Sequence, residues 1–421
     1  MFLLVISALL VAFLFHELIW KRRNLPPGPT PLPFIGNMLD FARRSVPFVA
    51  VNDLETLQIF VKESDTFADR KPFDEFNRLI RGGTYGIIDT SGPLWREQRR
   101  FALKTLRDFA SGNQLQEQIL EEVQEIFDKV DADIKAGVDE HAFEKHTDLA
   151  TGSLINNTIC GYRYSTEGRS DEFYKVKALT ADLATIFFDP LLQVLITNKY
   201  LARLPFIRSK LDHTVDVSNQ IQGRLAKIIA EHQQQNDYAA GGFEPHFWLA
   251  GQESTSIFLT WGIGFLITNP HVQQKLHDEL DRVIGSDRMI TTADRNALVY
   301  TNAVLIEINR RCNLGMNIAR LTSKPVELGG CLLPKGSVVV PMVETPSWDG
   351  AVFPDPKKFD PERWIDENGH LKRADEVLSF SIGKRACPFS AGKTPPSMKK
   401  FGGGGSFFCE PYTCRIERRY T

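Results

Sequence analysis

The stretch "SFSIGKRACPFSAGKTPPS", Ser379–Ser397, places one cysteine, Cys387, behind a glycine and two cations. Lys384 and Arg385 favour the ionised form of that thiol, and a thiolate is a strong, soft ligand for iron or zinc. Gly383 lets the backbone pass close to a flat partner. The pattern therefore indicates a metal or cofactor ligand at Cys387.

Cys387 is also compatible with two further roles. The plainest is a buried structural cysteine. The second is a zinc ligand, but a zinc site would need more ligands, and although Cys409 and Cys414 follow in the chain, no histidine spacing matches such a site. The six cysteines have no framework spacing, which favours a reducing compartment over a disulfide scaffold.

The composition of the whole chain narrows the class of function. The 421 residues are 43% hydrophobic and 24% charged, which is ordinary for a globular protein. The formal net charge of -2 provides no basic excess to neutralise phosphates, so we expect no nucleic-acid partner.

The N-terminal segment has a membrane pattern. Residues 1–20 are apolar almost throughout and are followed by Lys21–Arg23, so we expect a membrane anchor with the remainder on the cytosolic side. A cleaved signal peptide is the alternative. Residues 21–38 are basic and proline-rich and predict a stiff hinge, with one domain over residues 39–421. The sequon at Asn156 would then face the cytosol and carry no glycan.

The residue pattern predicts a mainly α fold with a small β region. Helical periodicity runs from Leu94 to about Gln235. Val46–Val51 has strand character, and Lys324–Pro341 predicts a hairpin that turns at Gly329-Gly330. Alternating Pro, Asp and Gly predict ordered coil over Pro354–Gly369.

Several short motifs carry polar residues at suggestive spacings, although each is common by itself. "EINR" puts Glu307 and Arg310 on one helix face, as solvated ion pairs often are, and "DPERW" offers Arg363 in a coil. "WREQRR" puts Trp95 and Arg99 on one face of another helix. "LAGQESTS", Leu249–Ser256, places small, acidic and hydroxyl residues in an apolar helix, where they would either line a cavity or bond back to the helix.

Taken in order with the anchor and "FSIGKRAC", these motifs resemble the cytochrome P-450 family of haem-thiolate monooxygenases, in its microsomal, membrane-anchored branch. The resemblance covers most of the chain. It implies a P-450-like helical fold and haem as the cofactor, with the Cys387 thiolate as the axial ligand of the iron. Phe380, Gly383 and Arg385 match the family pattern before the cysteine, where Phe380 would shield the sulfur.

The same resemblance assigns roles to residues far away in sequence. Arg385, Arg99 with Trp95, and Arg320 would hold the haem propionates, because a guanidinium suits a carboxylate. Three residues resemble the buried ion network beneath the haem: Glu307, Arg310 and Arg363. Five residues would serve the oxygen side, the first two leaving room for dioxygen and the others relaying protons: Ala250, Gly251, Glu253, Ser254 and Thr255.

The sequence departs from the family after the cysteine. The family has one residue, a glycine and then a long helix, whereas here Pro388 and Phe389 follow, and Gly392, Pro395 and Pro396 oppose a long helix. The thiolate would lose the support of that helix dipole, so we expect weak haem retention.

Two more stretches look shortened relative to the family. Asp40–Val51 omits a helix and a strand, and Asn236–Gln252 omits the first half of the oxygen-site helix. We therefore expect an incomplete version of the fold, through absent coding segments or an imperfect gene model.

The resemblance implies a monooxygenase that inserts one oxygen atom from O2 into a lipophilic substrate of the xenobiotic, steroid or fatty-acid type. Electrons would come from an NADPH-dependent reductase, and the domain would face the cytosol at the endoplasmic reticulum membrane. The alternative is a non-catalytic, membrane-anchored remnant of the same fold with weak or no haem binding. An unrelated helical, membrane-tethered interaction protein is a third possibility, which the ordered motifs oppose.

Overall fold

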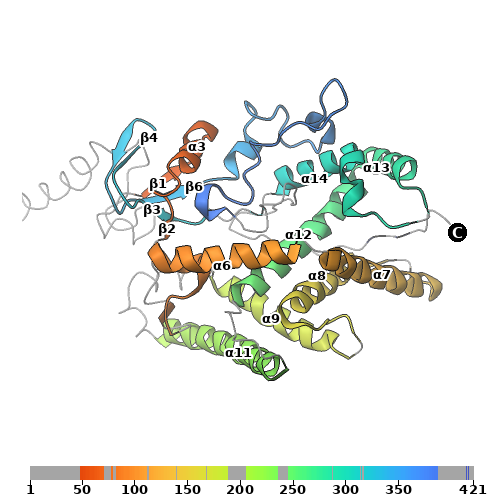
Figure 1. Ribbon diagram of the computed structural model, residues 1–421, viewed down its shortest axis with the longest axis horizontal. Helices are drawn as coiled ribbons and strands as arrows, with labels where there is room; N and C mark the ends of the chain where they lie inside the picture. Colours follow the sequence, from red (N-terminus) through yellow and green to blue (C-terminus); the bar gives the residue numbers. More distant parts are fainter. Residues whose placement is uncertain are drawn as a thin grey trace, which may run out of the picture.

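The computed structural model describes residues 48–386, apart from gaps at 71–76, 79–81, 111–112, 139, 167, 188–204, 236–244, 287, 313 and 315–316, together with residues 414 and 416. This part of the chain is mostly helical, with a small β region at one end (Figure 1). The predicted fold class is confirmed. Residues 1–47, with the expected anchor and hinge, and Cys387 lie outside the described residues. Among the residues that are described, no helix is long and apolar enough to cross a membrane.

The β region consists of two small sheets. The first has the strand order β1 (Phe48–Val51), β6 (Val338–Pro341), β3 (Arg320–Leu321) and β2 (Asp69–Arg70), with β1 and β6 parallel and the other pairs antiparallel. The second is a hairpin of β4 (Val326–Leu328) and β5 (Cys331–Leu333). Gly329 and Gly330 both have positive φ in its turn, as a tight hairpin requires, so the hairpin prediction is confirmed.

Helix α3 (Leu54–Lys62) packs against this β region. The side chain of Asp53 accepts a hydrogen bond from the Thr56 amide at 2.7 Å and so caps the first turn. Leu57 and Phe60 are fully buried in a cluster with Val339 of β6. The helix therefore forms one wall of the sheet's hydrophobic core.

The helical periodicity between Leu94 and Gln235 is confirmed over the residues described. Helices α5 (Gly86–Asp89) and α6 (Gly92–Ala110) pack together, and α11 (Pro205–Gln235) packs on α9 (Ser170–Phe187). The described part of this stretch also contains α7 (Asn113–Lys135) and α8 (Phe143–Cys160).

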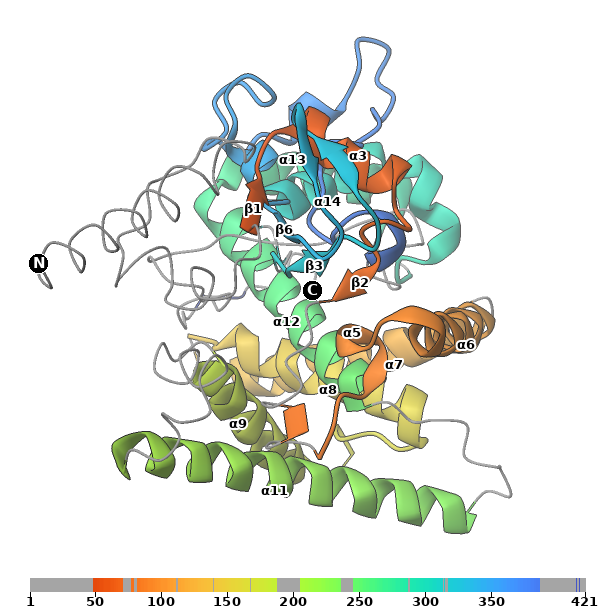
Figure 2. The same cartoon turned by 90° about the vertical axis from the view of Figure 1, so that its left-hand side faces the viewer.

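Helix α12 (Pro245–Thr268) connects the two parts of the molecule. It passes between the region of α13 (Pro270–Val283) and α14 (Val299–Cys312) and the region of α8 and α9 (Figure 2). It also contacts α5. Because apolar residues are spread around the whole helix and do not form a single stripe, burial on more than one face is the expected arrangement.

The segment that follows the first sheet contains short 3-10 turns. The prediction of coil over Pro354–Gly369 is wrong at one place, where Pro361–Trp364 forms the turn η5, because Pro361 at the first position fits a helical φ. The described part of this segment also contains the turns η4 (Thr345–Trp348) and η6 (Gly383–Arg385), and a further 3-10 turn, η3 (Thr292–Ala297), precedes α14.

Candidate functional site

The residues just before Cys387 are held closely against α3 and α14. Gly383 has a φ of +64°, and a Cβ at this position would lie 2.5 Å from the carbonyl oxygen of Phe60. The Ser379 hydroxyl donates to the carbonyl of Asn309 at 3.0 Å. Glycine is thus required at position 383 both by the backbone angle and by the close approach of α3.

Arg385 is buried and fixes the end of this segment. Its Nε donates to the carbonyl of Ala68 at 2.6 Å, and its Nη2 donates to the carbonyl of Thr90 at 2.6 Å. Its Nη1 donates to the carbonyl of Ile87 at 2.8 Å. The guanidinium lies 3.9 Å from the ring centroid of Trp95, whose indole donates to Ile87 at 3.1 Å. The Trp95 ring therefore packs against the Arg385 guanidinium and helps to hold it in place.

Arg99 lies one helical turn after Trp95 on α6 and contacts the same segment as Arg385. Its guanidinium lies 5.8 Å from the Trp95 ring centroid, and its Nη2 donates to the carbonyl of Ala386 at 2.5 Å. Ala386 immediately precedes Cys387. Phe380 is half-buried in the same segment. The structure thus brings Arg99 to the residue next to the candidate ligand, while Trp95 lies against Arg385, one residue earlier.

Arg320, on β3, is only 1% exposed. Its Nη2 donates to the Ser381 hydroxyl at 2.7 Å and to the carbonyl of Ile382 at 2.9 Å. Its Nε and Nη1 have no hydrogen-bond partner among the described residues. Buried N–H groups of a charged side chain are costly when unpaired, so they call for an acceptor that the described residues do not supply.

Arg70 is a site residue that the sequence analysis missed. It lies on β2 directly opposite Arg320 in the register of β2 and β3. Its Nε donates to the carbonyl of Ile88 at 3.2 Å, and its Nη1 donates to Ile318 and Ala319. No motif contains Arg70; only the pairing of two short strands places it at the site.

These arginines form a cluster in which each disfavours the positive charge of the others. Burial, followed by the charges of Arg70, Arg320 and Arg99, lowers the pKa of Arg385 to about 8, while Asp69 opposes them. Burial and then Arg70 lower the pKa of Arg320 to about 9. Because guanidinium groups stay charged in proteins, the cluster is a site of unfavourable positive potential that an anion would relieve.

The cluster fits the two propionates of haem. Its donors are fork-shaped guanidinium groups that pair well with carboxylates, and the unpaired N–H groups of Arg320 match a missing carboxylate acceptor. Gly383 adds a close backbone approach beside the cysteine. The residues present therefore fit the cofactor that the family resemblance implies.

A second group of predicted residues forms a buried ion network around Glu307 of α14. Arg310 donates from Nε to Glu307 Oε2 at 2.9 Å and from Nη2 to Oε1 at 2.7 Å, and both side chains are fully buried. Arg363 donates from Nε to Glu307 Oε1 at 3.3 Å. The structure thus brings together all three residues expected in the network.

Further groups complete the network, and sequence reasoning missed them. The Trp364 indole donates to Glu307 Oε2 at 2.9 Å, and the Asp360 amide donates to Oε1 at 3.0 Å. Arg310 also donates to the carbonyls of Ser347 and Pro356 at 2.8 and 2.9 Å. The "DPERW" motif therefore contributes its backbone and its tryptophan as well as Arg363. Every charge is satisfied, as a buried ion network requires.

The small residues of α12 have different surroundings. Ala250 is exposed in the described structure. Gly251 is buried, and a Cβ there would lie 2.9 Å from Ile155 Cδ1 on α8. The close packing of α8 on α12 is therefore one physical reason for glycine at this position.

The polar residues of α12 lie close to α8 and α9. The Ser254 hydroxyl donates to the carbonyl of Ala250 at 2.6 Å, and Thr255 is exposed. Burial raises the pKa of Glu253, against the opposing charge of Lys177. Ser254 thus makes the backbone bond considered from the sequence. The carboxyl of Glu253 holds its proton to a higher pH than an exposed glutamate does.

Comparison with known proteins now assigns the family. The sequence profile described as Cytochrome P450 matches residues 44–244 and 245–388. The chain belongs to the cytochrome P450 family. As a P450 it is a haem-thiolate monooxygenase, whose cofactor is haem with a cysteine thiolate ligand and which uses O2 and electrons from a redox partner.

Curated relatives of this P450 are similar over nearly the whole chain. It is 29% identical to Cytochrome P450 2C20 of Macaca fascicularis, over 91% of this chain and 88% of the relative. It is 29% identical to Cytochrome P450 2D20 of Mesocricetus auratus, over 90% of this chain and 85% of the relative. It is also 29% identical to Cytochrome P450 2A4 of Mus musculus, over 91% of this chain and 88% of the relative.

The P450 match has two features that bear on the expected missing blocks. It divides between residues 244 and 245, within Asn236–Gln252, and it ends at Pro388, the residue directly after Cys387. The alignment with the macaque relative runs over 445 residues although it covers only 91% of this 421-residue chain, so it contains gaps on the side of this chain.

Proposed function

We propose that the Cys387 thiolate binds haem iron, and that Arg70, Arg99, Arg320 and Arg385 bind the haem propionates. The observation that carries this proposal is the pair of unpartnered N–H groups on buried Arg320, opposite a second buried arginine. Trp95 would keep Arg385 in place, and Phe380 would shield the sulfur. Haem with a thiolate ligand supplies, when bound, the activation of dioxygen.

The residues of α12 would serve the oxygen side of the site. Ala250 and Gly251 would leave room for dioxygen. Glu253 would supply protons, because burial raises its pKa and keeps it protonated closer to neutral pH. Ser254 would have to turn its hydroxyl away from the Ala250 carbonyl to pass a proton on, and Thr255 offers a second hydroxyl.

The substrate would be a lipophilic compound of the xenobiotic, steroid or fatty-acid type, and the electron donor an NADPH-dependent reductase. Residues 1–20 would anchor the chain in the endoplasmic reticulum membrane, residues 21–38 would form the hinge, and residues 39–421 the cytosolic catalytic domain. The support is the apolar run followed by Lys21–Arg23.

The alternative is a non-catalytic remnant of the fold that binds haem weakly. It is favoured by the end of the family match at residue 388 and by Pro388, which has no N–H to donate toward the sulfur. The two functions differ in one observable, which is whether the purified full-length chain holds haem as a thiolate complex.

A haem titration of the purified full-length chain tests the proposed propionate site. Arg320→Gln should weaken haem binding by roughly tenfold to a hundredfold, because a charge-assisted hydrogen bond contributes about 1.5–3 kcal/mol. Arg208→Gln, which removes an exposed arginine paired with Asp212, is the control and should leave haem affinity unchanged. Equal haem affinity in all three proteins would contradict the assignment.

A further inference from the structure

Two histidines and an aspartate meet where α7 is joined to α8. Asp133 lies in the last turn of α7, His141 in the connection and His146 in the first turns of α8. One ligand atom of each side chain lies within 4.8 Å of the other two. No residue of this group belongs to the arginine cluster or to the Glu307 network.

His141 is the unusual member of the group. It is only 2% exposed, and neither of its ring nitrogens has a hydrogen-bond partner among the described residues. Its Nδ1 lies 3.6 Å from Asp133 Oδ2, which is longer than a hydrogen bond. A buried imidazole normally has at least one partner, so these nitrogens leave a ligand position unfilled.

The backbone holds His141 in place. Its amide donates to the carbonyl of Cys414 at 2.8 Å, and the Cys414 amide donates back to the carbonyl of His141 at 3.0 Å. This antiparallel bridge ties a residue near the C-terminus to the α7–α8 connection. The backbone of His141 is therefore fixed before any ligand binds to its imidazole.

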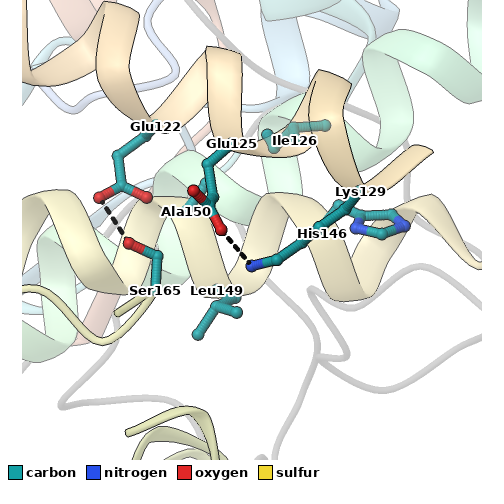
Figure 3. A pocket seen from close by; sticks show the side chains of 8 residues that line it. All are labelled: Glu122, Glu125, Ile126, Lys129, His146, Leu149, Ala150 and Ser165. Carbon is teal, nitrogen blue, oxygen red and sulfur yellow. Dashed lines mark hydrogen bonds and ion pairs between the residues drawn. The ribbon is translucent and has the colours of Figure 1, made fainter. Parts of the chain in front are cut away.

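The surroundings admit a cation from solvent. Asp133 brings a negative charge and its side chain is 44% exposed, and His146 is half-buried. The nearby cation Lys129 is paired with Glu125 at 3.1 Å. A small pocket of about 10 Å³ lies between α7 and α8, with His146 among its lining residues (Figure 3), and has room for about one water molecule.

We propose that Asp133, His141 and His146 bind one divalent transition-metal ion of the zinc type. Two imidazoles and one carboxylate are ligands that zinc prefers, whereas calcium and magnesium take oxygen ligands. The three ligand atoms already lie within 4.8 Å of one another, and binding one ion would draw them closer together. The bound ion would join α7, α8 and, through the bridge at His141, Cys414.

Calorimetric titration with ZnCl2 tests the site, using the purified full-length chain after a chelator has removed loosely held divalent ions but not haem. Asp133→Asn and His146→Gln are expected to weaken zinc binding by at least about tenfold. His370→Gln is the matched control, because His370 also has an aspartate nearby, Asp366 at 3.8 Å, but is exposed. This variant should bind zinc as the wild-type chain does.

Two further measurements distinguish zinc binding at this site from zinc binding elsewhere on the protein. Cys414→Ser should retain zinc affinity, which excludes a thiol site at that cysteine. Added zinc should raise the thermal midpoint of the wild-type and His370→Gln proteins but not of the two ligand variants, because ligand binding to the folded state stabilises it. Equal zinc affinity in the wild type and both ligand variants, or equal affinity for CaCl2, would overturn the proposal.

Discussion

Arg70 of β2 lies directly opposite Arg320 of β3, and both side chains are buried. Like charges at opposed positions of neighbouring strands destabilise a sheet, and burial increases the effect. An anion bound beside the two guanidinium groups would offset this repulsion in the functional protein. Haem carries two carboxylates, and the family to which the chain belongs uses haem.

The ion network around Glu307 should contribute to folding. Glu307→Ala leaves the buried guanidinium of Arg310 without its carboxylate and is expected to lower the free energy of unfolding by about 3–5 kcal/mol. The measurement is the thermal midpoint together with the yield of soluble protein. Glu362→Ala in η5 is the control, because its ion pair with Lys275 is exposed and such pairs contribute about 0–1 kcal/mol. Similar midpoints for the two variants would contradict a buried network.

Gly383 should tolerate no side chain. Gly383→Ala has to adopt a positive φ and also bring a Cβ to 2.5 Å from the Phe60 carbonyl oxygen. Gly369→Ala is the matched control, since Gly369 also has a positive φ, of +78°, but has no atom within 4 Å of the added Cβ. We expect the control to lose about 1 kcal/mol of stability and Gly383→Ala to lose clearly more. Chemical denaturation compares the two, and equal losses would show that only the backbone angle matters.

Burial of Glu253 should appear as a pH dependence of stability. Burial raises the pKa of this carboxyl above its ordinary value of 4.5, with Lys177 acting against it. The folded state therefore favours the protonated acid, and the associated stabilisation is complete below pH 4.5 and is lost as the pH rises through the raised pKa. Relative to Glu253→Gln, the wild-type thermal midpoint should fall as the pH rises above 4.5 and through the raised pKa. A constant difference between the two proteins across this range would contradict the shift.

The sequon at Asn156 should carry no glycan. The expected cytosolic orientation predicts this, and the structure adds a second reason: Asn156 is fully buried in α8 and its Nδ2 donates to the carbonyl of Tyr162 at 2.8 Å. Expression in microsomes followed by glycosidase treatment should produce no change in mobility. Added protease should digest the domain at the outer face of the same microsomes, and a domain protected from protease would contradict the orientation.

The parts of the site that local sequence could predict are those set by short-range geometry. Trp95 and Arg99 share a helix face because they are four residues apart, and Gly329-Gly330 makes a hairpin because both residues accept positive φ. Arg70 could not be found in this way. It reaches Arg320 through the pairing of two-residue strands far apart in the chain, which no local pattern encodes.

The Glu307 network shows the same division. The spacing of Glu307 and Arg310 predicted their pairing, but the pair looks the same on a solvated helix. Whether it is buried depends on the packing of η5, whose Trp364 completes the carboxylate's partners. Tertiary packing therefore decides whether the Glu307–Arg310 pair is buried. In the sequence, only the order of the motifs along the chain predicted that burial.

The segment after Cys387 should determine how well the thiolate forms. Pro388 supplies no N–H, and the prolines that follow oppose the helix whose N-terminus would favour negative charge on the sulfur. We expect loosely bound haem with a large thiol-ligated fraction. Restoring a helix-forming segment with glycine in place of Phe389 should increase the thiolate fraction, as followed by the Soret band.

The reduced carbon monoxide difference spectrum of the purified full-length chain, recorded beside that of Cys387→Ser, tests the central claim most directly. The account predicts a long-wavelength thiolate Soret band in the wild-type chain, accompanied by a thiol-ligated fraction, and loss of the thiolate band in the variant. A thiolate band that persists in Cys387→Ser, or a wild-type spectrum without any thiolate band, would contradict it.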